Sequence, residues 1–192
     1  MPMDPLPDLA SLSLAEIAKL VEERKLPPVK NWNPTHCGHS DMRIAADGTW
    51  FHQGSPIGRA EMVRLFSTIL RREPDGSFVL VTPVEKLTID VEDAPFVAAE
   101  VRSEGVERGR ALVFRLNTGE LVPADGEHGI TVREGDDGPR PYLHVRDGLE
   151  ALIARPVYYE LANIALDDAV GPDGRPGVWS NGIFFPLGST SE

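Results

Sequence analysis

The distribution of apolar residues predicts three amphipathic helices. In residues 13–25, Ser13 and Glu16 have the spacing of a capping box at the start of a helix, and Pro27 and Pro28 end it. Its apolar stripe is made of Leu14, Ile17, Ala18 and Val21. A second helix is expected from Arg59 to Arg72, before the stop at Pro74-Asp75-Gly76, and a third over residues 155–166, where Pro156 suits the first turn.

The rest of the chain has the pattern of short strands separated by turns. Residues 29–40 show no period and are expected to be a loop. A hairpin follows over residues 42–57, with Asp47-Gly48 as its turn and a second turn at residues 54–56. Further strands are expected at residues 77–81, 87–91, 96–101, 111–116, 120–124, 130–134 and 142–145, and a closing strand or hairpin within residues 172–188.

Two parts of the chain repeat the same order of landmarks. In the first part, a hairpin turns at Asp47-Gly48, a helix begins near Arg59, and residues 74–76 (PDG) end it before a strand. In the second, a hairpin turns at Asp147-Gly148, a helix begins near Arg155, and residues 172–174 (PDG) end it before a strand. Each turn alone is common, but three landmarks in the same order indicate a duplicated unit.

These patterns predict an α+β protein of two related domains, residues 1–83 and 84–192, which share a hairpin–helix–strand motif. Strands about ten residues apart predict a small antiparallel sheet or partial barrel with one helix in the second domain. The 192 residues are enough to bury a core without a disulfide or a metal ion.

Charge and composition narrow the partners. Residues 1–88 carry 11 acidic and 10 basic residues, a net charge of −1, whereas residues 89–192 carry 19 and 9, a net charge of −10. The acidic second half of the chain argues against nucleic acid or an anionic membrane as a partner. The single cysteine suits a reducing cytoplasm, no apolar run is long enough to span a membrane, and residues 1–8 lack the pattern of a signal peptide.

The duplication suggests a binding site. Arg59 and Arg155 each stand at the start of a predicted helix, where free N–H groups and the helix dipole attract anions and an arginine adds a bidentate donor. If the two units pack together, both helix starts can face one interface and bind a small anionic ligand there. The alternative is that each arginine pairs with a carboxylate of its own domain.

Residues 36–41 (HCGHSD) contain the only cysteine and two of the five histidines. Zinc needs about four converging ligands, and His52 is the one conceivable addition to His36, Cys37 and His39. A reactive thiolate needs a nearby cation and an oriented base, and no orienting partner is recognisable. We therefore expect no metal site and no catalytic residue here, but a loop in which Cys37 is a small buried apolar group.

Other residues are candidates for ligand contact. Thr82, Glu85 and Lys86 lie where the first unit is expected to meet the second. They are either ligand contacts or part of a plain linker. Trp50 and Trp179 can stack on a nucleobase or belong to the core, and of the adjacent Tyr158 and Tyr159 one must face outwards. The sequence has no GxxxxGK[ST] or GxGxxG motif, which excludes a P-loop or Rossmann nucleotide site. The acidic run 134–137 is expected to be a solvated loop.

Three stretches give a family resemblance. The segments DMRIAADGTWFHQGSPIGRAEMVRLFSTIL, LVTPVEKLTIDVEDAPFVA and WSNGIFFPLG together resemble the uncharacterised bacterial family called domain of unknown function 1285, from Trp32 to Leu187. The resemblance implies two domains built on a repeated motif, the C-terminal one superficially like a pleckstrin-homology fold. It also implies a nucleotide-like ligand at the domain interface and a role in signal transduction.

These observations lead to one functional expectation and two alternatives. We expect a cytoplasmic, non-enzymatic sensor that binds a small anionic, nucleotide-like ligand between its domains. The ligand contacts would be Trp50, Arg59, Thr82, Glu85, Lys86, Arg155, Tyr159 and Trp179. One alternative is a module that binds another protein and no small molecule. The other is an enzyme that uses Cys37 and a histidine; no cofactor can be named.

Overall fold

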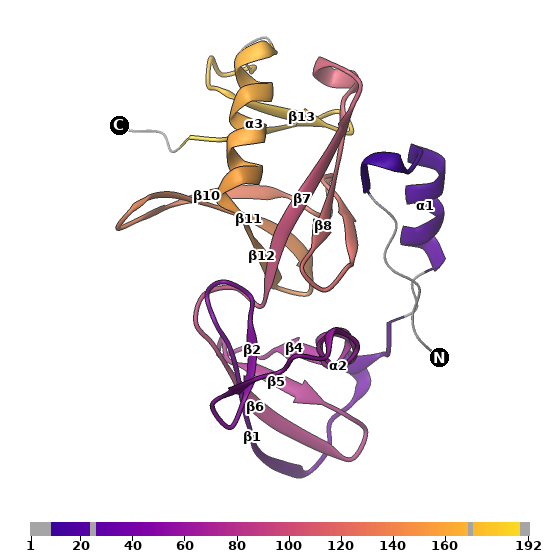
Figure 1. Cartoon of the computed structure of the whole chain (residues 1–192), viewed down its shortest axis with the longest axis vertical. Coiled ribbons are helices and arrows are strands. Elements are labelled where there is room, and N and C mark those ends of the chain that lie inside the picture. The colour runs from indigo at the N-terminus through magenta and orange to yellow at the C-terminus, as the bar shows by residue number, and fades with distance from the viewer. Residues whose placement is uncertain (1–8, 24–25, 169–170, 189–192) are drawn as a thin grey trace.

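The computed structural model describes residues 9–23, 26–168 and 171–188. The expectation for residues 1–8, the last two residues of the first predicted helix, and the side chain of Val21 lie outside what it describes. Two domains are stacked along the long axis of the molecule, with the first at the bottom of Figure 1 and the second at the top. The fold is α+β and consists of two related domains, as the sequence predicts.

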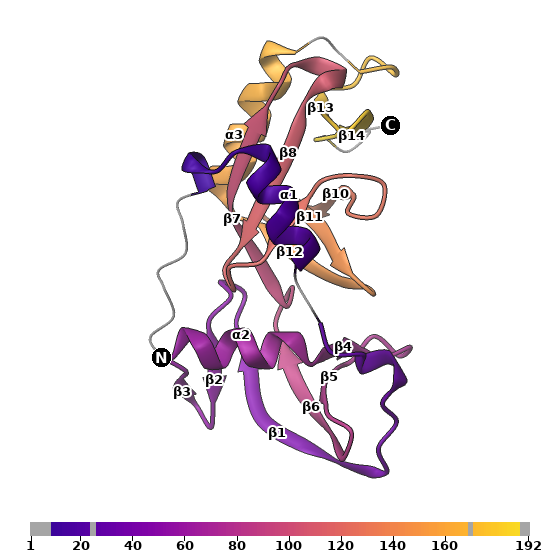
Figure 2. The same cartoon turned by 90° about the vertical axis from the view of Figure 1, so that its right-hand side faces the viewer.

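The first domain is a six-stranded sheet with one helix. The sheet has the strand order β3-β2-β1-β6-β5-β4. Helix α2 lies between this sheet and the second domain (Figure 2). The elements are β1 (His36–Ile44), β2 (Trp50–His52), β3 (Ser55–Pro56), α2 (Ala60–Thr68), β4 (Leu70–Arg72), β5 (Phe78–Val81) and β6 (Glu85–Val91), preceded by the 3₁₀ turn η2 (Val29–Asn31).

The second domain is also a six-stranded sheet, with the order β10-β11-β12-β7-β8-β9, a long helix and a separate hairpin. Its elements are β7 (Phe96–Glu104), η3 (Glu107–Gly109), β8 (Ala111–Leu116), β9 (Leu121–Pro123), β10 (Ile130–Gly135), β11 (Gly138–Arg146), β12 (Leu149–Ile153), α3 (Arg155–Asp167), β13 (Gly177–Ser180) and β14 (Ile183–Pro186). A mainly antiparallel sheet with one long helix is the arrangement expected for this half.

The hairpin–helix–strand order is present in both domains. In the first, β1 and β2 are joined by the turn at Asp47-Gly48 and are followed by β3, α2 and β4, and residues 74–76 (PDG) form the turn from β4 to β5 instead of ending the helix. In the second, β11 and β12 are joined at Asp147-Gly148 and are followed by α3 and β13. Asp147 and both glycines have positive φ, the conformation that such tight turns need.

Each sheet also contains one parallel pair at its centre, so neither is purely antiparallel. These pairs are β1 with β6 and β12 with β7. Parallel neighbours require a long crossover connection, and here each crossover contains the other four strands of its sheet. The central pairing is therefore a long-range contact, which short-range sequence patterns do not report.

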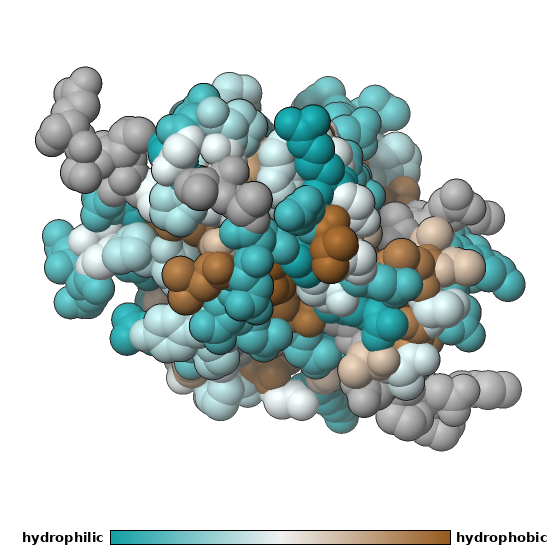
Figure 3. Space-filling view, turned by 90° about the horizontal axis from the view of Figure 1, so that it is seen from above, coloured by the Kyte–Doolittle hydropathy of each residue, from teal (hydrophilic) through white to brown (hydrophobic). Residues whose placement is uncertain are grey.

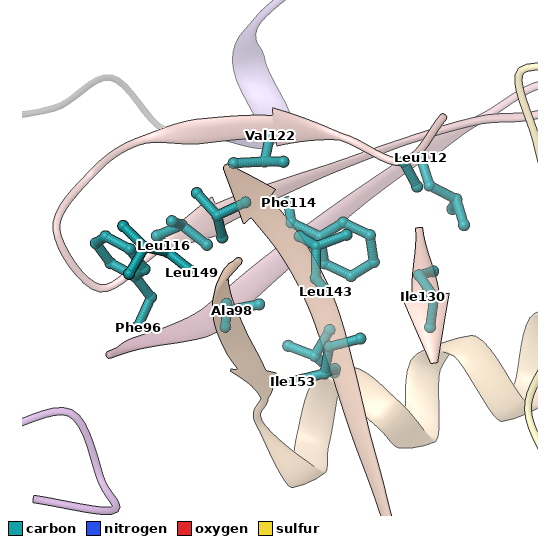
Figure 4. Packing of buried hydrophobic residues seen from close by; sticks show 14 of the residues in the cluster. Phe96, Ala98, Leu112, Phe114, Leu116, Val122, Ile130, Leu143, Leu149 and Ile153 are labelled. Atoms are coloured by element: carbon teal, nitrogen blue, oxygen red, sulfur yellow. The ribbon is translucent and has the colours of Figure 1, made fainter. Parts of the chain in front are cut away.

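The hydrophobic core is continuous between the domains. One cluster contains Trp50 and Leu70 of the first domain together with Phe96, Phe114 and Leu149 of the second. Figure 4 shows how the second sheet contributes to it, with side chains from several strands pointing into one space. Because close packing of this kind resists displacement, the two domains are expected to move as one unit.

Backbone turns of the two domains also interlock. The side-chain amide of Asn117 in the second domain donates a hydrogen bond of 3.2 Å to the carbonyl of Gly48 in the first. In the opposite direction, Arg72 donates one of 3.2 Å to the carbonyl of Gly148. Both Asp-Gly turns of the duplicated motif therefore lie at the domain interface.

An N-terminal segment precedes the first domain in sequence but packs against the second. It comprises η1 (Leu9–Ser11) and helix α1 (Leu14–Glu23), which lies beside the second domain (Figures 1 and 2). The expected capping box is present, since the amide of Glu16 donates to the Ser13 hydroxyl and the amide of Ser13 to the Glu16 carboxylate. Ile17, 2% exposed, packs with Val113 of the second sheet.

Three expectations from the sequence need correction. Residues 36–40 belong to strand β1 and not to a loop, because β6 pairs with them. The helix expected up to Arg72 ends at Thr68, and Leu70–Arg72 is strand β4, paired with β5. A boundary after residue 83 would cut the first sheet, since β6 pairs with β1 and β5 and the chain enters the second sheet only at Phe96.

Candidate functional site

A groove lies where α3 begins. It has a volume of about 320 Å³, at the lower end of the range for small-molecule sites. Figure 1 shows the β10–β11 hairpin extending past the lower end of α3, and the groove is lined from these two elements and the end of β12. Its lining residues include Asp137, Arg140, Pro141, Leu152, Arg155 and Tyr159.

Helix α3 starts without a capping side chain. Its N-cap is Ala154, whose methyl group can accept no hydrogen bond, and Pro156 follows within the first turn. No acidic residue stands in that turn. The amide groups and the positive end of the dipole at this helix start are therefore not neutralised by a neighbouring carboxylate of the helix itself.

The side chain of Arg155 has no partner in the part of the chain that the structure describes. Among the described residues, Arg59 and Arg155 are the arginines whose side chains make no hydrogen bond, ion pair or ring contact. Arg140, in the same groove, differs because its guanidinium pairs with Asp93 at 2.6 Å. Neither helix-start arginine pairs with a described carboxylate of its own domain, which is the alternative to ligand binding.

Tyr158 and Tyr159 both line the groove but differ in hydrogen bonding and exposure. Tyr158 donates a hydrogen bond of 2.5 Å to the carbonyl of Leu187 and so ties α3 to the end of the chain after β14. Burial, together with the negative charge of Glu134, raises the pKa of Tyr158 above its ordinary value. Tyr159 is 57% exposed and makes no such bond, so its ring and hydroxyl are accessible from the groove.

Of the eight candidate residues, the structure brings Arg155 and Tyr159 together in this groove. Arg59 is exposed at the N-cap of α2, and no residue of the first domain lines the groove. The two helix-start arginines therefore do not meet in one cavity. They repeat in sequence and in local position but face separate surroundings.

Trp50 is buried away from any ligand, and Trp179 already contacts side chains of its own domain. Trp50 is 1% exposed within the core and stacks near Phe66, with ring centres 6.4 Å apart. Trp179 is half-buried, and the guanidinium of Arg108 lies 4.8 Å from the centre of its ring. Trp50 therefore belongs to the core, and the ring of Trp179 packs in part against its own domain.

Thr82 lies in the turn from β5 to β6 and Glu85 and Lys86 begin β6, so the three residues do not link the domains. The Thr82 hydroxyl accepts a hydrogen bond of 3.2 Å from the amide of Glu85, which stabilises the turn. Lys86 lies 3.7 Å from the carboxylate of Glu73. Strand β6 leads into the second domain from its other end, so Glu85 lies roughly 20 Å along the strand from the domain junction.

The segment around Cys37 contains no assembled metal or thiol site. Cys37 is exposed, not buried as the sequence suggested. The ring of His39 accepts a hydrogen bond of 2.9 Å from the amide of Asp41 and lies 3.8 Å from the carboxylate of Asp90. In residues 9–23, 26–168 and 171–188, no three His, Cys, Asp or Glu side chains are grouped so as to hold a metal ion.

A second cavity, of about 210 Å³, lies at the domain interface, but its cations are already paired. Lys30 lies 2.5 Å from the carboxylate of Asp147. Arg71 donates to the carbonyls of Val29 and Trp32 and to Glu73. Arg146 forms two bonds of 2.8 Å with the Glu120 carboxylate. An anion entering this cavity would have to displace one of these partners.

The groove also contains residues that the sequence did not single out. Asp137 belongs to the acidic run that we expected to be a solvated loop, yet it lines the groove from the turn between β10 and β11. Pro139 and Pro141 follow it on β11. The signal in the sequence was the glycine- and proline-containing run DDGPRP after a strand, which marks a hairpin turn but not the element that it faces.

The chain is a two-domain α+β protein in which both domains repeat one hairpin–helix–strand motif. The description "Domain of unknown function (DUF1285), N-terminal domain" matches residues 27–94, and "Protein of unknown function (DUF1285), C-terminal domain" matches residues 95–187. The chain belongs to the DUF1285 family, and the two matches meet just before β7.

Solved structures agree with this assignment. A crystal structure of a DUF1285 family protein from Silicibacter pomeroyi DSS-3 is 46% identical, with a TM-score of 0.78, over 93% of this chain and 96% of that one. A second, from Shewanella baltica OS155, is 29% identical, with a TM-score of 0.50, over 64% of this chain and 91% of that one. None of the curated proteins compared with the chain matches it.

Proposed function

We propose that this protein binds a small molecule with a carboxylate or phosphate group in the groove at the start of α3. The observation that carries the proposal is the Arg155 guanidinium, which lines a cavity and has no partner among the described residues. An arginine with its donors free can bind a carboxylate or phosphate through two parallel hydrogen bonds. The uncapped helix start beside it adds a field of the same sign.

The other walls of the groove suit the body of such a ligand. Tyr159 offers an accessible aromatic ring, and Leu152 and Pro141 offer apolar surface. An anionic group held by arginine and an apolar or aromatic body against these side chains describe the ligand by its chemistry. A nucleotide-derived molecule belongs to this class and remains part of the proposal.

A sensor role and a cytoplasmic location complete the proposal. A ligand in the groove would touch both the β10–β11 hairpin and α3 and would restrain them relative to each other. Such a restraint is the form in which binding can be passed on to another protein. The proposal places binding in this groove and not between the domains, because the interface cavity holds its own ion pairs. In the part of the chain that the structure describes, no helix is long and apolar enough to cross a membrane.

The face seen in Figure 3 is consistent with a small ligand more than with a large apolar partner surface. Hydrophobic residues there lie in separate groups between hydrophilic ones. Contiguous apolar patches of several hundred Å² are the usual mark of a protein-binding surface.

The proposal can be tested by a thermal-shift screen of the full chain. The panel contains mononucleotides, cyclic nucleotides, dinucleotide cofactors, coenzyme A, and small carboxylates and phosphates. A ligand present at 100 times its Kd adds about 2.7 kcal/mol of stability, which corresponds to roughly 5–10 °C for a chain of this length. The dissociation constant of any compound that shifts the transition is then measured by calorimetry.

Variants locate the site. Arg155→Gln should weaken binding by about 10- to 100-fold, the usual range for losing hydrogen bonds to a charged group. Arg59→Gln is the matched control, because Arg59 is also an unpaired arginine at a helix start but lies outside the groove. A panel that gives no shift, or a ligand whose affinity is equal in Arg155→Gln and the wild type, would overturn the proposal.

A further inference from the structure

The groove has an unpaired negative charge as well as an unpaired positive one. Asp137, in the turn between β10 and β11, makes no hydrogen bond or ion pair with any described residue. It lines the groove from the hairpin, whereas Arg155 lines it from α3. The two side chains do not pair with each other, so two opposite charges stand apart along one cavity.

The lining of the groove also includes apolar side chains. Pro139, Pro141 and Leu152 line the groove, and the one further charged residue there, Arg140, is neutralised by Asp93. Asp93 is itself held in place by a hydrogen bond of 2.7 Å from the Tyr142 hydroxyl. The charges that remain for a ligand are therefore Arg155 and Asp137.

The charge of the surrounding domain points the same way. Residues 89–192 carry a net charge of −10, and Glu134 and Asp136 stand in the same turn region as Asp137. A ligand with only negative charges would enter against this field, which extends over about 10 Å at ordinary ionic strength. A ligand that also carries a positive charge would not.

We infer that the ligand of this groove is a zwitterion, with an anionic group bound by Arg155 and an ammonium group bound by Asp137. The inference rests on the proposed function and names the class of its ligand. The part of the molecule between the two charged groups is apolar and lies against the proline and leucine side chains. Compounds of this class include amino acids whose amino and acid groups stand at opposite ends of a short chain.

The two charges should contribute unequally. Asp137 is exposed, and exposed ion pairs are worth little, so the ammonium group should improve Kd by about two- to fivefold. The anionic group binds a guanidinium beside a helix start and should account for most of the affinity. Because the two contributions differ in size, the ligand class and the existence of the site can be tested independently.

The experiment measures Kd of the full-length protein by calorimetry for matched probes. One series consists of 4-aminobutyrate, 5-aminopentanoate and 6-aminohexanoate, each compared with the carboxylate of equal length that lacks the amino group. A second pair, O-phosphoethanolamine and ethyl phosphate, replaces the carboxylate by a phosphate. We expect the amino compound to bind more tightly at one chain length, which then reports the separation of Arg155 and Asp137.

Substitutions assign the effect. Asp137→Asn should remove the preference for the amino compound, so that the two members of each pair bind with similar Kd. The neighbouring Asp136→Asn is the matched control, since Asp136 is equally exposed but does not line the groove, and it should preserve the preference. Arg155→Gln should weaken both members of each pair.

The outcomes distinguish this inference from the proposed function. If plain acids or nucleotides bind through Arg155 and an amino group brings no gain, the zwitterion is wrong and the site stands. If the gain persists in Asp137→Asn, the assignment of the ammonium group is wrong. If no compound of the panel binds, the site itself fails, and this inference fails with it.

Discussion

The guanidinium of Arg146, in the second domain, donates a hydrogen bond of 2.9 Å to the carbonyl of Ser67, in the last turn of α2 in the first. The same guanidinium makes two bonds to Glu120, and it lies 5.3 Å from the centre of the Phe96 ring. A cation at the carboxyl end of a helix is favourable because it meets unpaired carbonyls and the negative end of the dipole. One side chain therefore holds the domains together at the end of a helix.

Replacement of Arg146 by Met should destabilise the whole chain. Glu120 is 8% exposed and would lose both bonds from Arg146, and removing one member of a buried pair commonly costs about 3–5 kcal/mol. Urea unfolding of the variant gives the loss. The double variant Arg146→Met with Glu120→Gln should recover part of it, because no charge then stays buried. A single variant within 1 kcal/mol of wild type would show that the domains do not depend on this contact.

Replacement of Gly48 by Ala should weaken the interface from the other side. Gly48 has φ of +87°, and a Cβ there would lie 2.7 Å from the amide nitrogen of Asn117 and 2.9 Å from Val97. The matched control is Gly54→Ala, where φ is +81° but no atom lies within 4 Å. Backbone strain should cost each variant about 1–2 kcal/mol, and crowding should cost Gly48→Ala about 1 kcal/mol or more in addition. Equal unfolding midpoints would contradict the contact.

Helix α1 should be held to the second domain mainly by Ile17. Ile17→Ala removes an almost fully buried side chain and should lower the docking stability of α1 by about 2 kcal/mol. Leu20→Ala, on the same helix but 43% exposed, is the control. Hydrogen exchange of the α1 amides should accelerate in the first variant and not in the second, while the strands of both sheets keep their protection. Unchanged exchange in Ile17→Ala would mean that other contacts hold the helix.

Stability should decrease in alkaline solution through the buried tyrosines. Burial raises the pKa of Tyr158, and burial with the hydrogen bond to Asp93 raises the pKa of Tyr142, above the ordinary value of 10.0. The unfolded chain then loses these protons first, so the stabilisation is complete below pH 10 and is lost as the pH rises through the higher folded values. Urea midpoints measured from pH 8 to 11 should fall less steeply for Tyr158→Phe than for wild type. Tyr159→Phe, at an exposed position, should keep the wild-type slope.

Much of the fold follows from local patterns. The Asp47-Gly48 hairpin, the helix at residues 155–166 and the final hairpin are each encoded by a few adjacent residues, and all three are present. The misassigned segments depend on distant partners. Residues 36–40 are mostly exposed and lack alternation, yet β6 makes them a strand. Leu70 fits a helical stripe as well as a strand, and its pairing with Leu80 decides between the two.

The candidate site was predictable only in part, for a similar reason. A helix start with an arginine is visible in the sequence and singles out Arg155, and the adjacent tyrosines of the same helix single out Tyr159. Which carboxylate is nearby depends on how a hairpin folds against that helix, and Asp137 could not be distinguished from Asp136 without the structure. The position of Trp50 beside a turn left stacking on a ligand and burial in the core both open, and the packing of α2 against the sheet places it in the core.

The docking of α1 also fixes an order of events during synthesis. The helix is made early, but Val113, against which Ile17 packs, lies 96 positions later in the chain. At about 5–20 residues per second, a ribosome needs roughly 5–20 s to cover that interval. The strands of the first sheet, the last of which ends at Val91, are synthesised within this interval, while the apolar side of α1 waits without its partner. Helix α1 therefore finds its partner only after the strands of the first sheet have been synthesised.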